Sequence, residues 1–184
     1  MHIVKYERVL TPAEYVQLKA FARIDGARLA LLWVASFTCY IVGIANPLYG
    51  MVALVLMVTT PFFVSRRLMK FRDEGLGGTI SFGRGWGYSL YTFFYASILL
   101  ALAQYVYFAY IDQGYLMQSF SQALTSAEAR QMIEQYGMQQ AIEESLEQFG
   151  RMRPIDYVLN ILTVNIMIGA VLGLPIAAFI KKLK

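Results

Sequence analysis

Four long stretches of this chain contain no charged side chain, and they decide what it can fold into. They run from 29 to 45, 48 to 64, 86 to 111 and 157 to 180, and by count they hold 17, 17, 26 and 24 residues. A helix needs roughly 17 to 25 apolar residues to cross the roughly 30 Å hydrocarbon core of a membrane. The pattern therefore predicts four membrane-spanning helices.

A bundle of four buried helices in a soluble protein is the alternative interpretation. Such helices carry a polar face at helical spacing, whereas these runs are apolar nearly all round. Apolar residues make up 58% of the chain and charged residues 15%, which also favours the membrane. We therefore expect an all-α integral membrane four-helix bundle, with an N-terminal amphipathic helix and a helical loop before span four.

Two further features concern targeting and redox chemistry. The first apolar run follows a charged segment, and no small-residue cleavage pattern comes after it. We therefore expect this run to remain as a span and not to be removed as a signal peptide. Cys39 is the single cysteine, and a single cysteine forms no disulfide within its own chain.

Basic residues near the ends of spans indicate orientation, because they stay on the cytoplasmic side. Of the 16 basic residues, 13 lie in segment 1–28, in loop 65–85 or in the tail after span four, whereas loop 112–156 has three against seven acids. This predicts a bacterial inner-membrane protein with both termini in the cytoplasm. The clustering at span ends also argues against a nucleic-acid partner, despite the net charge of +4.

The chain then divides into four parts. Segment 1–28 is a cytoplasmic amphipathic segment. Residues 29–111 hold spans one to three together with the basic cytoplasmic loop 65–85, residues 112–156 form an acidic periplasmic loop, and residues 157–184 hold span four and the basic tail.

The acidic loop has helical patterning. Thr125 and Glu128 fit a capping box, and four apolar residues follow at helical spacing, namely Met138, Ile142, Leu146 and Phe149. We expect a helical hairpin, or a bent helix, that rests by this stripe on the bundle, on lipid or on a partner. The simpler alternative is a solvated linker. The acidic face argues against anionic lipid as the main attraction.

The spans lack groups that could perform chemistry. None contains Asp, Glu, Lys, Arg or His, whereas transporters coupled to ions usually carry such groups at depth. His2 is the single histidine and lies at the terminus, which argues against a histidine metal site or general base. The glycine-rich stretch Gly83 to Gly87 is better explained as a helix start than as a phosphate loop. We expect no catalytic residue, no cofactor and no metal.

Span four has the strongest packing signal. Small residues and one amide recur every four positions: Asn165, Gly169, Gly173 and Ala177. Such a ridge allows close helix approach, either within this chain or against a second membrane subunit, and spacing alone does not separate the two. Pro61 and Pro175 each remove a backbone donor near the cytoplasmic end of a span, so we expect kinks there.

The N-terminal segment is also patterned. Thr11 can cap a helix, Pro12 suits its first turn and Glu14 completes a capping box. The resulting helix places an apolar side next to basic residues that could meet anionic headgroups. These residues are Tyr15, Leu18 and Ala22 on the apolar side, and Lys19 and Arg23 on the basic side. Asp25 and Arg28 are spaced to pair across one turn, as a structural anchor more than as a site.

These segments together carry a family resemblance. The stretches "EYVQLKAFARIDGARLALLWVASF" and "ISFGRGWGYSLYTFFYASILLALAQYVYFAYID", with the acidic helical loop before span four, resemble the Bacteroidetes four-span membrane protein family catalogued as domain of unknown function 4199. The resemblance covers nearly the whole chain. Relatives often have Asp-Pro after span three, where this chain has Asp112-Gln113, so the turn there can differ. The resemblance implies a small inner-membrane protein with no catalytic residues to carry over, in an accessory role beside an enzyme of lipid-linked sugar transfer.

Three functions remain open from the residues. The first is a non-catalytic accessory or scaffold subunit, whose partners are membrane lipids and either another membrane protein or a second copy of this chain. The second is a small carrier or flippase-like transporter of a lipid or apolar solute, which needs a groove open to lipid and lined by Asn160, Thr163 and Asn165. The third is an enzyme acting on a lipid-linked substrate, with carboxylate or phosphate contacts from Asp25, Arg28, Asp112 and Asp156. We rank the enzyme last, because the predicted topology divides these residues between the two sides.

Overall fold

The computed structural model describes residues 10–182, and this part of the chain is built from helices. The prediction for His2, and the basic residues at positions 1–9 and 183–184 that were used to predict orientation, lie outside the described residues. The elements, with η marking two π-helical turns, are α1 (Pro12–Ala45), α2 (Pro47–Val58), α3 (Thr60–Lys70), η1 (Phe71–Gly75), α4 (Phe82–Val106), η2 (Tyr107–Ile111), α5 (Tyr115–Leu124), α6 (Ala127–Gln135), α7 (Gln139–Arg151) and α8 (Pro154–Ile180).

Four of these helical segments are long and apolar enough to cross a membrane. They are Pro12–Ala45, Pro47–Gly75, Phe82–Ile111 and Pro154–Ile180. Large apolar side chains remain exposed along them, and the most exposed on the second segment are Leu48, Met51, Leu54, Val55, Met57, Val58 and Phe62. Such a wide apolar surface is typical of contact with lipid. The predicted all-α fold with four span-capable helices is confirmed.

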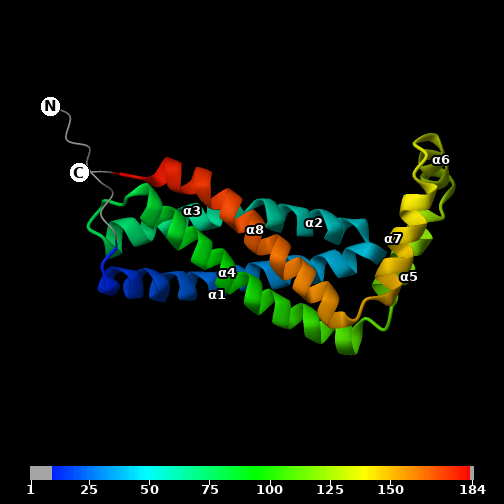
Figure 1. Cartoon of the computed structure of the whole chain (residues 1–184), viewed down its shortest axis with the longest axis horizontal. Coiled ribbons are helices and arrows are strands. Elements are labelled where there is room, and N and C mark those ends of the chain that lie inside the picture. The colour runs from blue at the N-terminus through cyan, green and yellow to red at the C-terminus, as the bar shows by residue number, and fades with distance from the viewer. Residues whose placement is uncertain (1–9, 183–184) are drawn as a thin grey trace.

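The helix α4 lies in the middle of the bundle (Figure 1), with α1 packed along it on one side and α8 on another. The second segment runs back beside α1, first as α2 and then as α3, and α3 also reaches α8. Asn46 makes the turn between α1 and α2, because it ends α1 and its side chain accepts a hydrogen bond from the Leu48 amide at 3.1 Å. The bundle therefore has two distinct ends.

We name these ends by what they carry. The basic end holds the starts of α1 and α4, the segment from Arg66 to Ser81 and the end of α8. The cap end holds the turn at Asn46 and the three short helices α5, α6 and α7. At the basic end, Ile80 and Lys182 exchange two backbone hydrogen bonds of 2.9 and 3.0 Å, which join the segment before α4 to the tail after α8.

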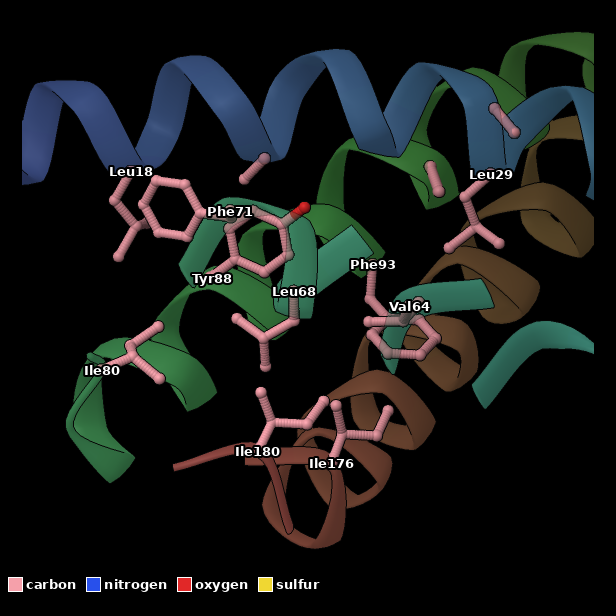
Figure 2. Close-up of a cluster of buried hydrophobic side chains, with 13 residues drawn as sticks. Leu18, Leu29, Val64, Leu68, Phe71, Ile80, Tyr88, Phe93, Ile176 and Ile180 are labelled. Carbon is pink, nitrogen blue, oxygen red and sulfur yellow. The ribbon is translucent and has the colours of Figure 1, made fainter. Parts of the chain in front are cut away.

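The buried core is concentrated toward the basic end (Figure 2). Phe71 of η1 and Tyr88 of α4 stack with ring centroids 4.9 Å apart, and Phe21 of α1 lies 5.0 Å from Phe71 on another side. Leu68 and Phe93 are also fully buried there. Aromatic rings packed in this way add to the stability that their burial provides, so this end of the bundle is closed by side chains.

The N-terminal amphipathic helix and span one form a single helix, α1. Its predicted apolar side packs inside the protein: Leu18 and Ala22 are buried in the core, and the hydroxyl of Tyr15 hydrogen-bonds to that of Tyr91. The apolar side of this helix is therefore covered within the chain, and contact of Lys19 and Arg23 with anionic headgroups stays a prediction. Lys19 lies 4.6 Å from the ring centroid of Tyr15.

The acidic loop forms a helical hairpin in which α7 packs on α5, with α6 at the far end from the bundle (Figure 1). The sequence interpretation missed α5. The predicted capping box at Thr125 is one residue off, because Thr125 ends α5 and Ser126 caps α6 by accepting a hydrogen bond from the Ala129 amide at 3.3 Å.

The predicted cap stripe follows α7 from its start to its end. Ile142 and Leu146 are half-buried, and Met138 and Phe149 are exposed. Phe149 reaches the bundle, where its ring stacks on Tyr157 of α8. The rest of the stripe continues along the hairpin, away from the bundle.

Candidate functional site

The small-residue ridge of α8 lies against α4. Gly169 and Gly173 are buried, and a Cβ added to Gly169 would lie 2.4 Å from Phe93, whereas one added to Gly173 would lie 3.2 Å from Ser89. The Cβ of Ala177 would lie 3.4 Å from one added to Gly85. Small residues let two helix backbones approach closely, so this part of the ridge is occupied inside the chain itself.

Asn165 and the two prolines are the other residues that the sequence analysis singled out in the spans. Asn165, at the cap-end side of the ridge, is half-buried. Pro61 is the second residue of α3, directly after the break that separates α3 from α2. Pro175 lies inside α8, which runs unbroken from Pro154 to Ile180.

Asp25 sits at the centre of a buried polar cluster near the basic end. Its side chain is 2% exposed. One carboxylate oxygen accepts from Arg67 Nη2 at 2.6 Å, Arg67 Nε at 2.7 Å and Arg28 Nη1 at 2.9 Å. The other oxygen accepts from the hydroxyl of Tyr88. A buried carboxylate is stable only when charge and hydrogen bonds compensate its lost hydration, and both are present here.

This cluster joins three helices through one side chain, because Asp25 lies on α1, Arg67 on α3 and Tyr88 on α4. The pairing with Arg28 is confirmed. The sequence interpretation missed Arg67 and Tyr88, which lie 42 and 63 residues further along the chain. Since each oxygen of the carboxylate is engaged, the cluster is suited to holding the helices in register more than to accepting a proton from a substrate.

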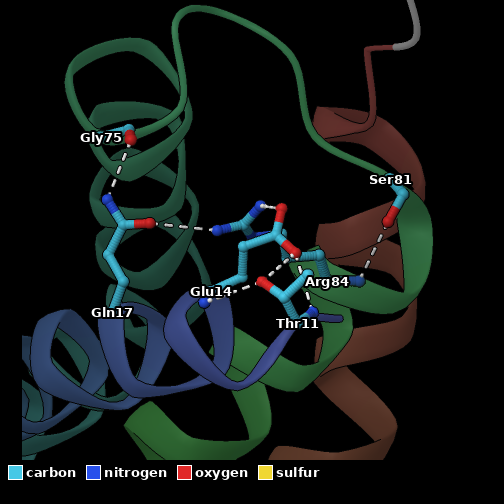
Figure 3. A network of polar contacts seen from close by, with 6 residues as sticks. All are labelled: Thr11, Glu14, Gln17, Gly75, Ser81 and Arg84. Carbon is cyan, nitrogen blue, oxygen red and sulfur yellow. Dashed lines mark hydrogen bonds and ion pairs between the residues drawn. The ribbon is translucent and has the colours of Figure 1, made fainter. Parts of the chain in front are cut away.

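A second polar network ties the start of α1 to the start of α4 (Figure 3). The predicted capping box is confirmed: Glu14 accepts from the Thr11 amide at 2.9 Å, and Thr11 Oγ1 accepts from the Glu14 amide at 3.3 Å. Arg84 of α4 then donates to Glu14 at 3.2 Å and to Gln17 at 3.2 Å. Gln17 in turn donates to the Gly75 carbonyl at 3.1 Å.

The glycine-rich stretch Gly83 to Gly87 forms the first turns of α4. Ser81 caps this helix, accepting from the Arg84 amide at 3.4 Å. Gly85 packs against Ala177, so the glycine serves helix approach. This arrangement agrees with a helix start rather than a phosphate-binding loop.

A large cavity lies at the cap end, under the α5–α7 hairpin. Its volume is about 1130 Å³, and α1, η2, α5, α7 and α8 all contribute to its wall. Five aromatic residues line it: Tyr40, Phe108, Phe120, Phe149 and Tyr157. Small-molecule sites commonly have volumes of about 300–1,000 Å³ and mostly apolar walls. The size and lining of this cavity therefore make it the best candidate for a binding site in the described part of the chain.

Three stacked rings form one side of the cavity. The Tyr157 ring lies 5.5 Å from that of Phe108 and 6.1 Å from that of Phe149, and the Tyr157 hydroxyl donates to the Phe149 carbonyl. This stack connects η2, α8 and α7. It holds the hairpin against the bundle and keeps the cavity wall aromatic.

Asp112 is the charged residue of the cavity lining. Its two oxygens accept from the Gly114 and Leu116 amides, each at 3.1 Å. The turn that follows has Gln113 at φ 44° and Gly114 at φ 86°. Proline holds φ near −65°, so an Asp-Pro sequence could not form this turn. Asp112 is half-buried, and the phenol of Tyr107 interacts with its carboxylate.

Asn160 is the residue of the proposed carrier groove that lines this cavity, donating its amide to the Asp156 carbonyl at 2.9 Å. Thr163 and Asn165 are not part of the lining. Beside the cavity, Arg153 hydrogen-bonds to Asp156 at the first turn of α8, before the apolar run begins. This contact holds the pKa of the Asp156 carboxyl below its ordinary value of 3.8.

The four residues weighed for an enzyme fall at opposite ends of the bundle. Asp25 and Arg28 lie in the half of α1 that starts at the basic end, whereas Asp112 directly follows η2 and Asp156 lies in the first turn of α8, both at the cap end. Among residues 10–182, no group of three or more His, Cys, Asp or Glu side chains is placed to hold a metal ion. The four residues of the enzyme hypothesis therefore do not meet in one site.

Comparison with known proteins identifies the family. Searches of curated proteins and of solved structures found no match. The family model described as "Protein of unknown function (DUF4199)" matches residues 25–182, and the chain therefore belongs to this family.

Proposed function

We propose that this chain is a non-catalytic, multi-pass protein of the bacterial inner membrane that acts as an accessory or scaffold subunit of a membrane complex. The observation that carries this proposal is the cap hairpin, which projects from the bundle and ends in α6 (Figure 1). A hairpin of three helices is more structure than a connection between α4 and α8 needs. Its far end makes few contacts with the bundle, so it is free to contact another protein.

The proposed orientation places the basic end in the cytoplasm and the cap end outside. Arg66, Arg67, Lys70 and Arg72 at the basic end support it, because basic residues favour the cytoplasmic side. A variant with Cys39 replaced by Ser and a single new cysteine at Gln131 should react with a membrane-impermeant maleimide in intact spheroplasts. The same variant with its cysteine at Lys181 instead should react only after the membrane is broken. The reverse result would overturn the orientation.

The far part of the hairpin has the composition of a contact surface. Met132, Tyr136 and Met138 are 56%, 70% and 49% exposed, and Met and Tyr are enriched at protein interfaces. Around them lie the acidic residues Glu128, Glu134, Glu143, Glu144 and Glu147. Complementary charge steers association, so the partner should present a basic, partly apolar surface on the outer side.

A matched pair of tyrosines tests this proposal. Tyr136 on the hairpin and Tyr110 on η2 are exposed to nearly the same extent, 70% and 72%. A photoreactive phenylalanine analogue at position 136 should cross-link one membrane protein in native membranes, and the analogue at position 110 should not. An enzyme of lipid-linked sugar transfer is the expected class of partner.

Substitution decides whether the captured protein is a partner. Tyr136→Ser combined with Met132→Ser should abolish stoichiometric co-purification of the protein cross-linked at position 136, while Tyr110→Ser should leave it intact. Recovery of the chain alone from native membranes, or equal co-purification in all variants, would refute the hairpin as a contact surface.

A carrier of a lipid or apolar solute is the second candidate, because the cap-end cavity includes Asn160. The core around Phe71 and Tyr88 closes the basic end, so transport would require a second conformation. Purified protein in vesicles should therefore not accelerate the transfer of a fluorescent lipid between leaflets. Acceleration that a cavity-filling Val164→Trp substitution abolishes would favour the carrier instead.

A further inference from the structure

The cap-end cavity crosses the edge of the apolar spans. Ile161 and Val164 of its wall belong to the apolar run of α8, and Tyr40 and Ile44 belong to that of α1. Asp112 and Gly114 lie just beyond the apolar run that ends at residue 111. An occupant that matches this wall has an apolar part on the membrane side and a polar part at the surface. An amphiphile from the surrounding leaflet fits that description.

An apolar cavity of this size does not stay empty inside a membrane. Protein interiors are close-packed, and unfilled space loses dispersion contacts. The cavity is partly open to its surroundings, so a lipid chain can enter it from the side. The apolar wall therefore explains how an acyl chain would bind, and the polar residues decide which headgroup is preferred.

Charge selects the headgroup. Asp112 is an acid, the described lining contains no Lys or Arg, and residues 112–156 carry seven acids against three bases. An anionic headgroup would meet repulsion at short range, whereas an ammonium group would be attracted by the carboxylate. Aromatic faces also attract cations, and five aromatic residues line the wall. The site therefore favours a cationic group.

The carboxylate also favours one kind of ammonium group over another. Each Asp112 oxygen accepts one backbone amide and the Tyr107 phenol also interacts with the carboxylate, but a carboxylate can accept about four donors in all. A primary ammonium carries three N–H donors that can use this room, whereas a trimethylammonium group has none. Charge-assisted hydrogen bonds of this kind are the stronger ones.

We infer that this cavity binds a phospholipid with a primary ammonium headgroup, of the phosphatidylethanolamine class. The ammonium group lies at Asp112, and one acyl chain follows the wall formed by Tyr40, Ile44, Ile161 and Val164. This inference rests on the cap end facing the outer leaflet as proposed, and it does not depend on the accessory role.

The test is lipid competition with the purified full-length protein. Protein in mild detergent is incubated with equal amounts of phosphatidylethanolamine, phosphatidylcholine and phosphatidylglycerol, and the retained lipids are counted by native mass spectrometry. We expect one phosphatidylethanolamine, preferred over phosphatidylglycerol. Asp112→Asn should reduce that preference about tenfold, because it removes the charge. Glu74→Gln, which neutralises an acid of η1 at the basic end, should leave the preference unchanged.

A second variant keeps the inference testable if Asp112→Asn fails to fold. Val164→Trp fills the apolar wall and should lose the bound lipid while the unfolding temperature stays near that of the wild type. Equal retention of all three lipids would overturn the inference, as would retention that survives Val164→Trp. A preference for phosphatidylcholine would overturn the hydrogen-bond assignment to Asp112. A second copy or a partner segment that occupies the cavity would overturn the lipid as its occupant. Because no partner protein is present, failure of this test would not affect the accessory proposal.

Discussion

Replacing Gly169 by Ala should destabilise the bundle although it adds only a methyl group. The added Cβ would lie 2.4 Å from both Cβ and Cγ of Phe93, whereas carbon atoms in contact normally lie about 3.5–4.0 Å apart. The Cβ of Phe93 is fixed to the backbone of α4, so no change of rotamer can move it. The helices α4 and α8 would have to part locally by roughly 1 Å.

The size of the effect follows from two opposing terms. Forcing an extra methyl group into a packed interface costs about 1–3 kcal/mol, and this contact belongs at the upper end because backbone-fixed atoms meet. Ala gains about 1 kcal/mol over Gly in a helix. The net loss is therefore about 2 kcal/mol, or an unfolding temperature roughly 4–8 °C lower for a protein of this size. Tryptophan fluorescence in mild detergent can follow the transition, because Trp86 Nε1 donates to the Ala170 carbonyl at 3.0 Å across the same interface.

Two other glycines provide controls. A Cβ on Gly173 would lie 3.2 Å from its nearest neighbours, and one on Gly150 would have no neighbour within 4 Å. Gly173→Ala should therefore change stability little, and Gly150→Ala should be neutral or slightly stabilising. If Gly169→Ala unfolds at the wild-type temperature while Gly150→Ala behaves as expected, the close approach of α8 to α4 is incorrect.

Three further predictions concern Asp25, Asp156 and the turn at Gln113. Asp25→Asn should lower the free energy of unfolding by about 3 kcal/mol, because it leaves the Arg67 charge without its buried carboxylate. Chemical denaturation in detergent would measure this change, and a value under about 1 kcal/mol would contradict the prediction. The pKa of Asp156 is lowered by Arg153, so the cap of α8 should be intact above pH 3.8 and be lost as the pH falls through the lower folded-state pKa. Hydrogen exchange at the Arg153 amide, corrected for its intrinsic pH dependence, should therefore rise on acidification of the wild type. In Asp156→Asn the corrected exchange should not depend on pH. Gln113→Gly should stabilise the turn by up to about 1 kcal/mol, whereas Gln113→Pro should lower the unfolding temperature, and equal unfolding temperatures would contradict the left-handed conformation.

Features that depend on neighbouring residues could be predicted from the sequence. The four apolar runs specify helices because each backbone group in a membrane must be paired within its own segment. The box of Thr11 and Glu14 is local, since it spans three residues. The pairing of Asp25 with Arg28 is local in the same sense. The spacing of Gly169 and Gly173 predicted close helix approach, although spacing alone did not identify α4 as the helix that fills it.

Features that depend on distant residues could not be predicted. Arg67 and Tyr88 meet Asp25 only because α1, α3 and α4 converge, and no local pattern encodes that meeting. The cavity has the same origin, since its wall is assembled from five separate elements. The cap predicted at Thr125 is one residue off for another reason. Thr125 and Ser126 are adjacent hydroxyl residues that could each cap α6, but Thr125 ends α5 and Ser126 caps α6.

The unbroken helix α1 couples the two ends of the molecule mechanically. Its 34 residues extend about 50 Å, well beyond the roughly 30 Å of hydrocarbon. In the half that starts at the basic end it carries Asp25, held by two arginines and a tyrosine, and near the cap end it supplies Tyr40 and Ile44 to the cavity wall. A tilt of this helix about Asp25 would move both wall residues together. An occupant of the cavity at the cap end and a contact made at the basic end would thereby influence each other through this one helix.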